Sequence, residues 1–515
     1  MALPRRELLR RALALAAAGL CLPALSRAQA RPAFSAYPFS LGVASGSPST
    51  DGFVLWTRLA PEPLAGGGMP PEPVEVRWEV AHDEKFSRLA KRGSVLAQPS
   101  RAHAVHVEPE GLEPARAYFY RFIAGGVASP VGRTRTLPAA GAGDARLRLA
   151  LASCQQYEQG WFTAHRHLVA EDPDLVAFVG DYIYESSWGR EHVRKHHIGE
   201  PYDLAQYRDR HAQYRTDPDL QAAHACAPWL VTWDDHEVDN DYANDRGEDL
   251  LPDFLRRRAA AYQAYFEHMP LRARVLRPDG EVRLYDRHAW GSLASLHVLD
   301  DRQYRAHQAC PKPDRGGSAI VGPSCAARLD EGRSMLGAAQ EKWLEEGLAA
   351  ARQRWTIVVQ QTLMAPAGTN AEKGRQHWTD GWDGYPWARA VFTDLLAKTR
   401  APNPVVLGGD VHANYVADLH HFPERPDSPV VASEFCGTSI TSQGPGEKRT
   451  QAIRDANPHI PFAEGTRRGY VLLEFGTRRL EAKLRTVETV KQPGSPVSTR
   501  AAFVVKDGRP GPKPA

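Results

Sequence analysis

Residues 174–185 read DLVAFVGDYIYE, in which a short apolar run ends in glycine and is followed by a carboxylate, Asp181, and a phenol, Tyr184. Near-continuous runs of Val, Leu, Ile and Phe are typical of strands covered on both faces of a sheet. Five further runs of this kind occupy residues 147–154, 228–235, 294–301, 354–361 and 403–410. Helical patterns lie between some of them, at 254–268 and 336–353. The sequence therefore predicts an α/β domain built of strand and helix layers.

This predicted domain spans residues 147–490, and each of its six strands ends in residues that can carry chemistry. Ligands of open α/β sheets bind beyond the carboxyl ends of the strands, so these side chains are expected to meet at one edge. A single aspartate after a strand is usually a turn former, and a free cysteine is usually a buried thiol. Because the same pattern recurs at several strand ends, we interpret these residues as metal ligands: Cys154, Asp181, Tyr184, Asp235, Asp410 and His412.

Residues 36–138 show a different pattern, with short segments rich in Val, Tyr, Phe and Trp separated by Gly and Pro. Such segments are typical of the strands of an all-β domain. Residues 112–120, LEPARAYFY, resemble the tyrosine corner of fibronectin-like sandwiches. We therefore expect an N-terminal fibronectin- or immunoglobulin-like β-sandwich domain, followed by an Ala/Gly-rich linker over residues 139–146. A Pro/Gly-rich C-terminal tail is expected over residues 491–515.

The first 30 residues have the features of an export signal. Arg5 and Arg6 begin a basic region, a 14-residue apolar stretch follows, and residues 28–30 fit a small-x-small cleavage site. The arginine pair indicates the twin-arginine route, which predicts a periplasmic or secreted protein and contact with the twin-arginine export machinery. An N-terminal helix of the folded protein is the alternative. No later stretch reaches 18 apolar residues, so the mature chain is expected to have no membrane span.

Charge argues against nucleic acid as a partner. The formal net charge is +3, but residues 1–30 hold five arginines and one glutamate, a surplus of +4, which leaves −1 for the remainder. A nucleic-acid-binding surface needs a clear excess of basic residues. Cys310 and Cys325 bracket a polar, Gly-rich segment and could form a disulfide in an oxidising compartment.

Several motifs in one order resemble those of PhoD-type alkaline phosphatases, within the calcineurin-like metallophosphatase superfamily. The resemblance covers nearly the whole mature chain, and its segments are FSLGVASGSPSTDGFVLWTRL, GDYIYE, WDDHEVDNDYAN, DDRQYR, TDGWDGYPWAR, GGDVHANY and EFCGTSI. It implies a metallophosphatase sandwich of strand and helix layers. It also implies one Fe(III) and calcium, normally two ions, as cofactors rather than zinc.

The resemblance divides the predicted ligands into two sets. A thiolate, a carboxylate, a phenolate and an imidazole would suit Fe(III), and they come from Cys154, Asp181, Tyr184 and His412. A second set supplies only oxygen, which suits calcium, and consists of Asp181 as a bridge with Asp235, Asp410, Asn240 and Asp383. Asn240 and Asp383 are equally well interpreted as a turn cap and a loop acid.

The implied reaction is hydrolysis of small phosphate monoesters by metal-activated oxygen attack, the reaction of an alkaline phosphatase. His236 is expected to contact the phosphoryl group or protonate the leaving oxygen, with orientation of a ligand as the alternative. Arg302 is expected to bind two phosphoryl oxygens, with a salt bridge to Asp300 or Asp301 as the alternative. Two other functions stay open for the whole chain. One is a phosphodiesterase or phospholipase D-like hydrolase on the same metals, and the other is an exported binding protein with a degenerate site.

Overall fold

The computed structural model describes residues 33–143, 146–277, 281–372, 374–425 and 427–515. The export signal predicted over residues 1–30 lies outside them, as does part of the predicted linker. Residues 34–515 cluster as one unit. A search of the described residues finds no helix with the length and apolar character that crossing a membrane requires.

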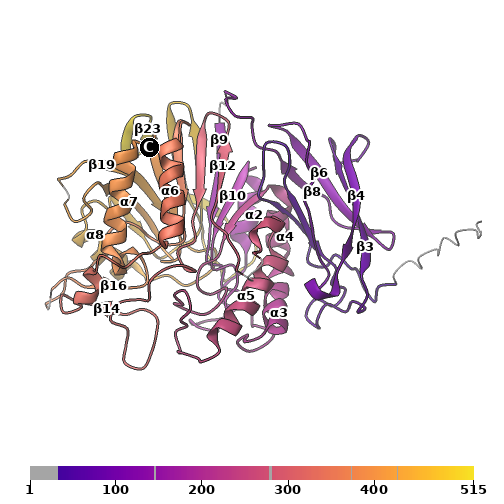
Figure 1. Cartoon of the computed structure of the whole chain (residues 1–515), viewed down its shortest axis with the longest axis horizontal. Helices are drawn as coiled ribbons and strands as arrows, with labels where there is room; N and C mark the ends of the chain where they lie inside the picture. Colours follow the sequence, from indigo (N-terminus) through magenta and orange to yellow (C-terminus); the bar gives the residue numbers. More distant parts are fainter. Residues whose placement is uncertain (1–32, 144–145, 278–280, 373, 426) are drawn as a thin grey trace, which may run out of the picture. The chain divides into compact units, whose positions relative to one another are not determined.

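The six predicted strands all form, but they belong to two sheets rather than to the single sheet edge expected from the sequence (Figure 1). Three of them are parallel neighbours in a ten-stranded sheet, and the other three are parallel neighbours in a seven-stranded sheet. The ten-stranded sheet contains, in order across it, β24 (Arg509–Pro514), β23 (Val497–Lys506), β22 (Arg479–Val487), β21 (Arg468–Gly476), β9 (Arg146–Ala152), β10 (Leu175–Val179), β11 (Trp229–Thr232), β1 (Val43–Gly46), β2 (Val54–Arg58) and β5 (Ala104–Val107). The seven-stranded sheet contains β12 (Asp286–Trp290), β13 (Ala294–Val298), β15 (Trp355–Val359), β17 (Pro404–Gly408), β19 (Val430–Cys436), β18 (Asn414–His420) and β20 (Phe462–Glu464).

The two sheets share one apolar core, which includes Leu149 and Leu151 of β9, Ile357 of β15 and Leu407 of β17. The other face of the ten-stranded sheet packs against α2 (Thr163–Ala170), α3 (Leu204–Arg215), α4 (Pro218–Cys226) and α5 (Phe254–His268). The other face of the seven-stranded sheet packs against α6 (Ala338–Ala350) and α7 (Pro386–Thr399). The layers are therefore helix, sheet, sheet and helix.

Smaller elements complete the described fold. Helix α8 (Glu447–Ala456) lies beside β20, and β14 (Ile320–Val321) pairs with β16 (His377–Trp378). The short 3-10 helices are η1 (Pro99–Arg101), η2 (Ala273–Val275), η3 (Ala326–Leu329) and η4 (Trp382–Gly384). Local sequence fixes some helix starts, since Asp203 forms a capping box with α3 and Asp217 caps α4 ahead of a proline.

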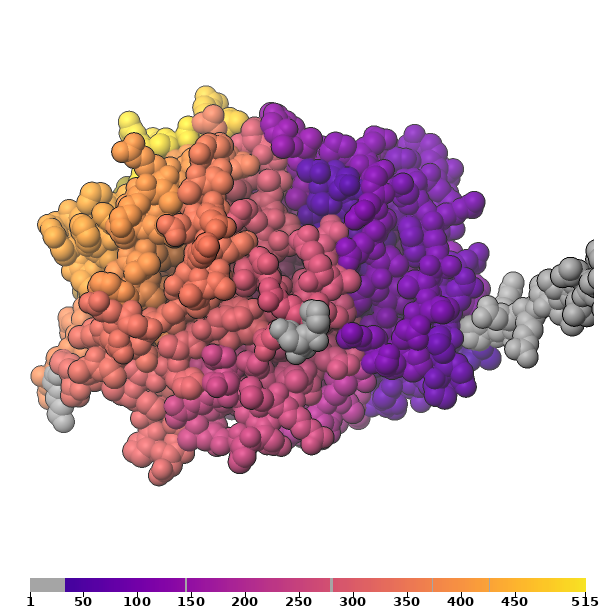
Figure 2. Space-filling model, viewed as in Figure 1, coloured from indigo at the N-terminus to yellow at the C-terminus, as the bar shows by residue number. Residues whose placement is uncertain are grey.

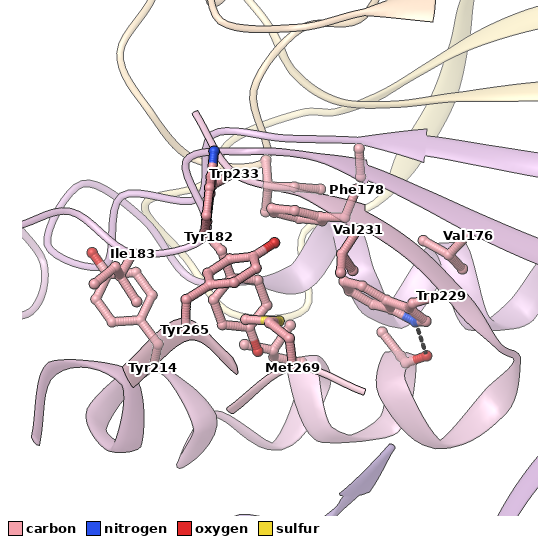
Figure 3. Close-up of a cluster of buried hydrophobic side chains, with 14 of the residues drawn as sticks. Val176, Phe178, Tyr182, Ile183, Tyr214, Trp229, Val231, Trp233, Tyr265 and Met269 are labelled. Atoms are coloured by element: carbon pink, nitrogen blue, oxygen red, sulfur yellow. Dashed lines mark hydrogen bonds between the residues drawn. The ribbon is translucent and has the colours of Figure 1, made fainter. Parts of the chain in front are cut away.

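Aromatic side chains pack between strands β10 and β11 and the helices that cover this face of the sheet (Figure 3). Phe178 of β10 and Trp229 of β11 stack with ring centroids 5.4 Å apart. The Trp229 indole N–H donates to the Ala223 carbonyl of α4 at 3.0 Å. Burial of one such side chain stabilises the fold by about 1.5–3 kcal/mol. The strands that end in Asp181 and in the WDDHE segment are therefore firmly held.

The N-terminal region is all-β, as expected, but it shares a sheet with the α/β part. One of its layers contains β4 (Leu89–Ala97), β3 (Val74–Ala81), β6 (Ala117–Ala124), β7 (Val127–Ala128) and β8 (Gly132–Arg135). The other layer is β1, β2 and β5, and Gly46 of β1 pairs with Trp229 of β11. The Tyr118 hydroxyl accepts a hydrogen bond from the Glu113 N–H at 3.0 Å, as a tyrosine corner requires.

The tail predicted over residues 491–515 is wrong, because most of this segment is β-strand. Strand β23 pairs with β22 and β24 pairs with β23, so they extend the ten-stranded sheet to its edge. The last residues, yellow in Figure 2, form part of the surface. Prolines are compatible with an edge strand, since its outer N–H groups need no partner in the sheet. Phe503 and Val505 are buried in the core between the sheets.

Candidate metal centre

The ends of β9, β10 and β17 meet in one place. Ligand atoms of Cys154, Asp181 and His412 all lie within 4.8 Å of one another. The Tyr184 hydroxyl lies 2.6 Å from Asp181 Oδ2 and 3.1 Å from His412 Nε2. The structure thus brings together the four residues predicted to supply a thiolate, a carboxylate, a phenolate and an imidazole.

Asp181 is shared with a second group, because ligand atoms of Asp181, Asp235 and His236 also lie within 4.8 Å of one another. Asp410 is close to this group, since Arg302 Nη2 lies 3.6 Å from Asp235 Oδ1 and 3.8 Å from Asp410 Oδ1. A carboxylate common to two groups is the arrangement needed for a bridging ligand.

Asp181, Asp235, His236, Asp410 and His412 line a cavity of about 720 Å³. Its described lining includes two arginines, Arg315 and Arg449, and ten acidic residues: Asp181, Glu185, Glu200, Asp235, Asp239, Asp241, Glu248, Asp249, Asp383 and Asp410. Asp181 Oδ1 and Asp410 Oδ2 are buried and have no hydrogen-bond partner among the described residues. A buried carboxylate oxygen without a partner is costly, and a bound cation removes that cost. The donor set therefore fits metal ions.

The backbone at these strand ends is left-handed. The φ angles of Cys154, Asp181, Asp410 and His412 are 59°, 57°, 65° and 53°. Non-glycine residues seldom adopt such angles, and the exceptions cluster at functional sites. Gly180 has a φ of 100°, and a Cβ there would lie 2.4 Å from the Asp234 Cβ. Only glycine therefore allows the ends of β10 and β11 to approach this closely.

Glu237 joins these two strand ends. Its buried carboxylate accepts the N–H groups of Asp181, Tyr182 and Asp234 at 3.1, 2.7 and 2.9 Å. Burial, followed by the charge of Asp181, raises the pKa of Glu237 to about 8. The side chain that follows His236 in the WDDHE motif is therefore a positioning group for the Asp181 turn.

Burial favours the protonated form of three of the predicted ligands, Cys154, Tyr184 and Asp410. Burial raises the pKa of the Cys154 thiol and of the Tyr184 hydroxyl well above their usual ranges, and the Asp181 carboxylate adds to both shifts. Burial also raises the pKa of Asp410, with Arg302 opposing the shift and neighbouring acids adding to it. A bound cation reverses this balance, so binding would release protons.

His236 lines the cavity next to Asp235. Its Nδ1 lies 2.7 Å from Glu185 Oε2, which leaves Nε2 free of this contact. Burial lowers the pKa of His236, but the carboxylates of Glu185, Asp235 and Asp181 outweigh burial and raise the pKa well above its usual value. The prediction that His236 faces the reacting group is compatible with this placement.

Arg302 is not placed to bind a substrate. Its side chain is 1% exposed, and it does not belong to the lining of the cavity. Its guanidinium pairs with Asp234 through Nε and with Asp380 through Nη1, the latter at 2.5 Å. The alternative prediction, a salt bridge from Arg302 to Asp300 or Asp301, names the wrong partners. Asp300 accepts the backbone N–H of Arg302 and not its guanidinium. Arg302 instead neutralises the carboxylates behind the predicted ligands.

Asn240 and Asp383 line the cavity but have other partners. The Asn240 amide donates to Glu248 Oε2 at 2.9 Å. Asp383 Oδ1 pairs with Arg389 at 2.6 Å, and its Oδ2 accepts the Ala367 N–H at 3.1 Å. The interpretation of Asp383 as a structural loop acid is therefore favoured over metal ligation.

Asp241 and Asp380 were not predicted. Their ligand atoms and those of Asp235 lie within 4.8 Å of one another. Both Asp380 oxygens are already taken, since Oδ1 pairs with Arg305 at 2.7 Å and Oδ2 pairs with Arg302. Both acids lie in quoted motifs, WDDHEVDNDYAN and TDGWDGYPWAR, but spacing alone does not show which acid of a motif faces the site.

Comparisons with known proteins agree with this arrangement. Residues 149–484 match the family described as PhoD-like phosphatase, and residues 25–138 match the PhoD-like phosphatase, N-terminal domain. The chain is 46% identical over 495 residues to alkaline phosphatase D of Bacillus subtilis (strain 168), a match that covers 94% of this chain and 83% of that protein. A solved structure described as "Structure of PhoD" matches with a TM-score of 0.90 and 45% identity, covering 94% of this chain and 93% of the other.

The fold and these matches define the chain as an enzyme, a phosphatase. Both matched regions together span most of the sequence. The chain belongs to the PhoD-like phosphatase family.

Proposed function

We propose that this phosphatase is a metal-dependent alkaline phosphatase that hydrolyses small phosphate monoesters. The observation that carries the proposal is the convergence of Cys154, Asp181, Tyr184 and His412, with Asp181 shared by the group that includes Asp235. The name of the Bacillus subtilis relative supports the reaction. We also propose that the fold is a metallophosphatase sandwich with an N-terminal immunoglobulin-like domain, which the four layers and the Tyr118 hydrogen bond support.

We propose that Fe(III) is held by Cys154, Asp181, Tyr184 and His412, because thiolate and phenolate groups suit this ion. Calcium, as two ions, would take oxygen ligands from Asp181, Asp235 and Asp410, with Asn240 offering its amide oxygen. Asp383 is left out because Arg389 holds it. When bound, the ions supply charge neutralisation and an activated oxygen nucleophile.

The residues of the chain would hold and protonate the substrate. His236, fixed at Nδ1 by Glu185, can donate a proton from Nε2 to the leaving oxygen. Trp188 stacks on His412 with ring centroids 5.6 Å apart and an interplanar angle of 6°, which fixes the imidazole. Arg302 and Glu237 hold the surrounding carboxylates and turns.

A phosphodiesterase activity on the same metals is the second candidate. The cavity of about 720 Å³ is much larger than one phosphoryl group, and part of its wall is apolar, including Leu363, Tyr415 and Ile453. Such a wall can accept an organic substituent, and the cavity has room for two of them. A side-by-side assay of p-nitrophenyl phosphate and bis-p-nitrophenyl phosphate separates the two activities.

The Asp181→Asn variant tests the metal proposal. We expect it to lose bound metal, any visible phenolate–Fe(III) absorption, and nearly all hydrolysis of p-nitrophenyl phosphate. The control is Asp394→Asn, which removes a half-exposed carboxylate on α7 that pairs with Lys398. Metal content is measured by elemental mass spectrometry. An Asp181→Asn enzyme that keeps its metals and its activity would reject the proposed centre.

We further propose export by the twin-arginine route to the periplasm or the medium, after removal of residues 1–30. The support is the N-terminal sequence pattern together with the disulfide between Cys310 and Cys325, a bond typical of oxidising compartments. N-terminal sequencing of the exported protein tests this proposal. A start before residue 28 would contradict the predicted cleavage site.

A further inference from the structure

The segment closed by the Cys310–Cys325 disulfide lies against the acidic wall of the cavity. The Gly316 N–H donates to the Glu248 carbonyl at 2.7 Å, and the Ser318 N–H donates to Asp241 Oδ2 at 2.9 Å. Beyond Ser318, strand β14 pairs with β16. We call residues 310–325 the disulfide loop.

Asp241 connects this loop to a predicted ligand. Its backbone N–H donates to Asp235 Oδ2 at 2.6 Å. Its carboxylate is held by the loop through Ser318, and its carbonyl accepts the Gln308 side-chain amide at 2.5 Å. Two hydrogen bonds in sequence therefore join the disulfide loop to the Asp235 carboxylate.

The backbone on both sides of this connection has little room to move. Asp241 has a φ of 56°, a conformation that only glycine, asparagine and aspartate adopt readily, so its side-chain anchor matters for its backbone. Gly317 has a φ of 73°, and a Cβ there would lie 3.0 Å from the Asp241 Cβ. At Gly316 a Cβ would lie 2.4 Å from the Gly247 carbonyl oxygen. A shift of the loop would therefore be transmitted to Asp241.

We propose that the disulfide loop is a positioning element for Asp235 that acts through Asp241, so that opening the disulfide weakens cation binding at Asp235 while the Cys154–Asp181–His412 group stays loaded. The proposal rests on the proposed function in one respect, that Asp235 binds a cation. Asp241 is a positioning residue in this scheme.

Reduction is chemically accessible. Cys310 is an exposed residue, whereas Cys325 is buried, so the bond lies at the surface on its Cys310 side. A thiolate of a dithiol reductant attacks the Cys310 sulfur and forms a mixed disulfide, the Cys310–Cys325 bond breaks, and Cys325 leaves as a thiolate. The second thiol of the reductant then attacks the mixed disulfide and releases Cys310. Each cysteine gains one electron and one proton, and the reductant becomes a disulfide.

The experiment compares the wild-type holoenzyme with Cys310→Ser/Cys325→Ser. Calcium alone is the probe, titrated by calorimetry into protein from which weakly held cations have been dialysed. Partners that orient a ligand typically change metal affinity about 10- to 100-fold, and we expect a loss of about 10-fold or more. The tightly held metal, measured by elemental mass spectrometry, is expected to stay at the wild-type level. Lys312→Ala, within the loop, and Cys226→Ser, a free cysteine outside it, are controls expected to bind calcium normally.

A second pair of variants keeps the test decisive if the double serine variant folds poorly. Asp241→Ala removes the acceptor for Ser318 but keeps the backbone N–H, and we expect the same loss of calcium affinity. Asp241→Asn retains an oxygen acceptor and tolerates the left-handed backbone, so we expect it to restore most of the affinity. Unchanged calcium affinity in the folded serine variant, or equal loss of both metals, would overturn the proposal.

Hydrogen exchange gives a readout that does not depend on the enzyme's reaction. Opening the disulfide should speed exchange in a peptide that covers residues 238–244, because the Asp241 N–H loses its fixed acceptor geometry. Faster exchange with no calcium binding even in the wild type would contradict the proposed function and leave the mechanical link standing. Unchanged exchange would contradict the link itself.

Discussion

Replacement of Glu237 with glutamine tests how the Asp181 turn is held. Glu237 Oε2 accepts the N–H groups of Asp181 and Asp234, and Oε1 accepts that of Tyr182. A glutamine side chain has one acceptor oxygen, so its amide NH₂ must face at least one backbone N–H. A buried donor left without an acceptor costs about 1–3 kcal/mol.

This free-energy cost destabilises the backbone turn that holds Asp181, the predicted bridging ligand. At about 1.4 kcal/mol for each factor of ten, it corresponds to about 5- to 150-fold in cation affinity. We therefore expect the Glu237→Gln variant to bind its cations about 10- to 100-fold more weakly and to need more added metal for half-maximal p-nitrophenyl phosphate hydrolysis. Excess metal should restore most of kcat.

The matched control is Glu434→Gln. Glu434 is also buried, accepts the N–H groups of Met364 and Ala365 at 2.6 and 2.8 Å, and has its pKa raised by burial to about 7. Its donors are not predicted ligands, so the same chemical change should reduce stability and leave cation affinity unaltered. Wild-type affinity in Glu237→Gln, or an equal loss in both variants, would refute the reasoning.

Two further predictions concern stability. Arg302→Met leaves the buried Asp234 carboxylate without its arginine partner and removes one of the two arginines that pair with Asp380. We therefore expect a loss of about 3–5 kcal/mol in the free energy of urea unfolding, with little change in KM. A large rise in KM would instead support the substrate-binding role. Burial lowers the pKa of His211 to about 3, below its unfolded value of about 6.5, so this residue contributes stability above pH 6.5 that is lost as pH falls toward 3. The His211→Phe variant should take up one proton fewer on unfolding in acid, which is measured as a smaller slope of the unfolding free energy against pH. An unchanged slope would contradict this prediction.

The positions of the strands could be predicted because their signal is local. Each apolar run contains its own evidence, and residues such as Asp181 and Cys154 follow directly after a run. Sheet membership has no local signal, since β11 and β13 look alike in sequence and yet belong to different sheets. The C-terminal strand was missed for a related reason, because Pro and Gly in RPGPKP disfavour a central strand but are tolerated at an edge.

Among the site residues, the sequence separates metal ligands from structural residues best where the residue type has few other roles at a strand end. Few tyrosines and histidines lie next to strand ends, whereas acidic residues are common there. The sequence therefore predicts Asp383 as a metal ligand and does not predict Asp241. The difference between these two acids depends on distant partners. Arg389 of α7 takes Asp383, and the disulfide loop turns Asp241 toward Asp235. Arg302 was misjudged for the same reason, since no sequence pattern reports its complete burial.

The division of the strands between two sheets gives the proposed ions a structural role. Cys154, Asp181 and Asp235 follow strands of the ten-stranded sheet, whereas Asp410 and His412 follow β17 of the seven-stranded sheet. Ions bound by both sets would cross-link the two sheets at the end where the apolar core stops. The buried acids there exceed the charge of Arg302, so the fold without cations must keep several of them protonated. Binding of the proposed cations would therefore be linked to sheet docking, and their removal should loosen this end of the core before the aromatic cluster beneath β10 and β11 is affected.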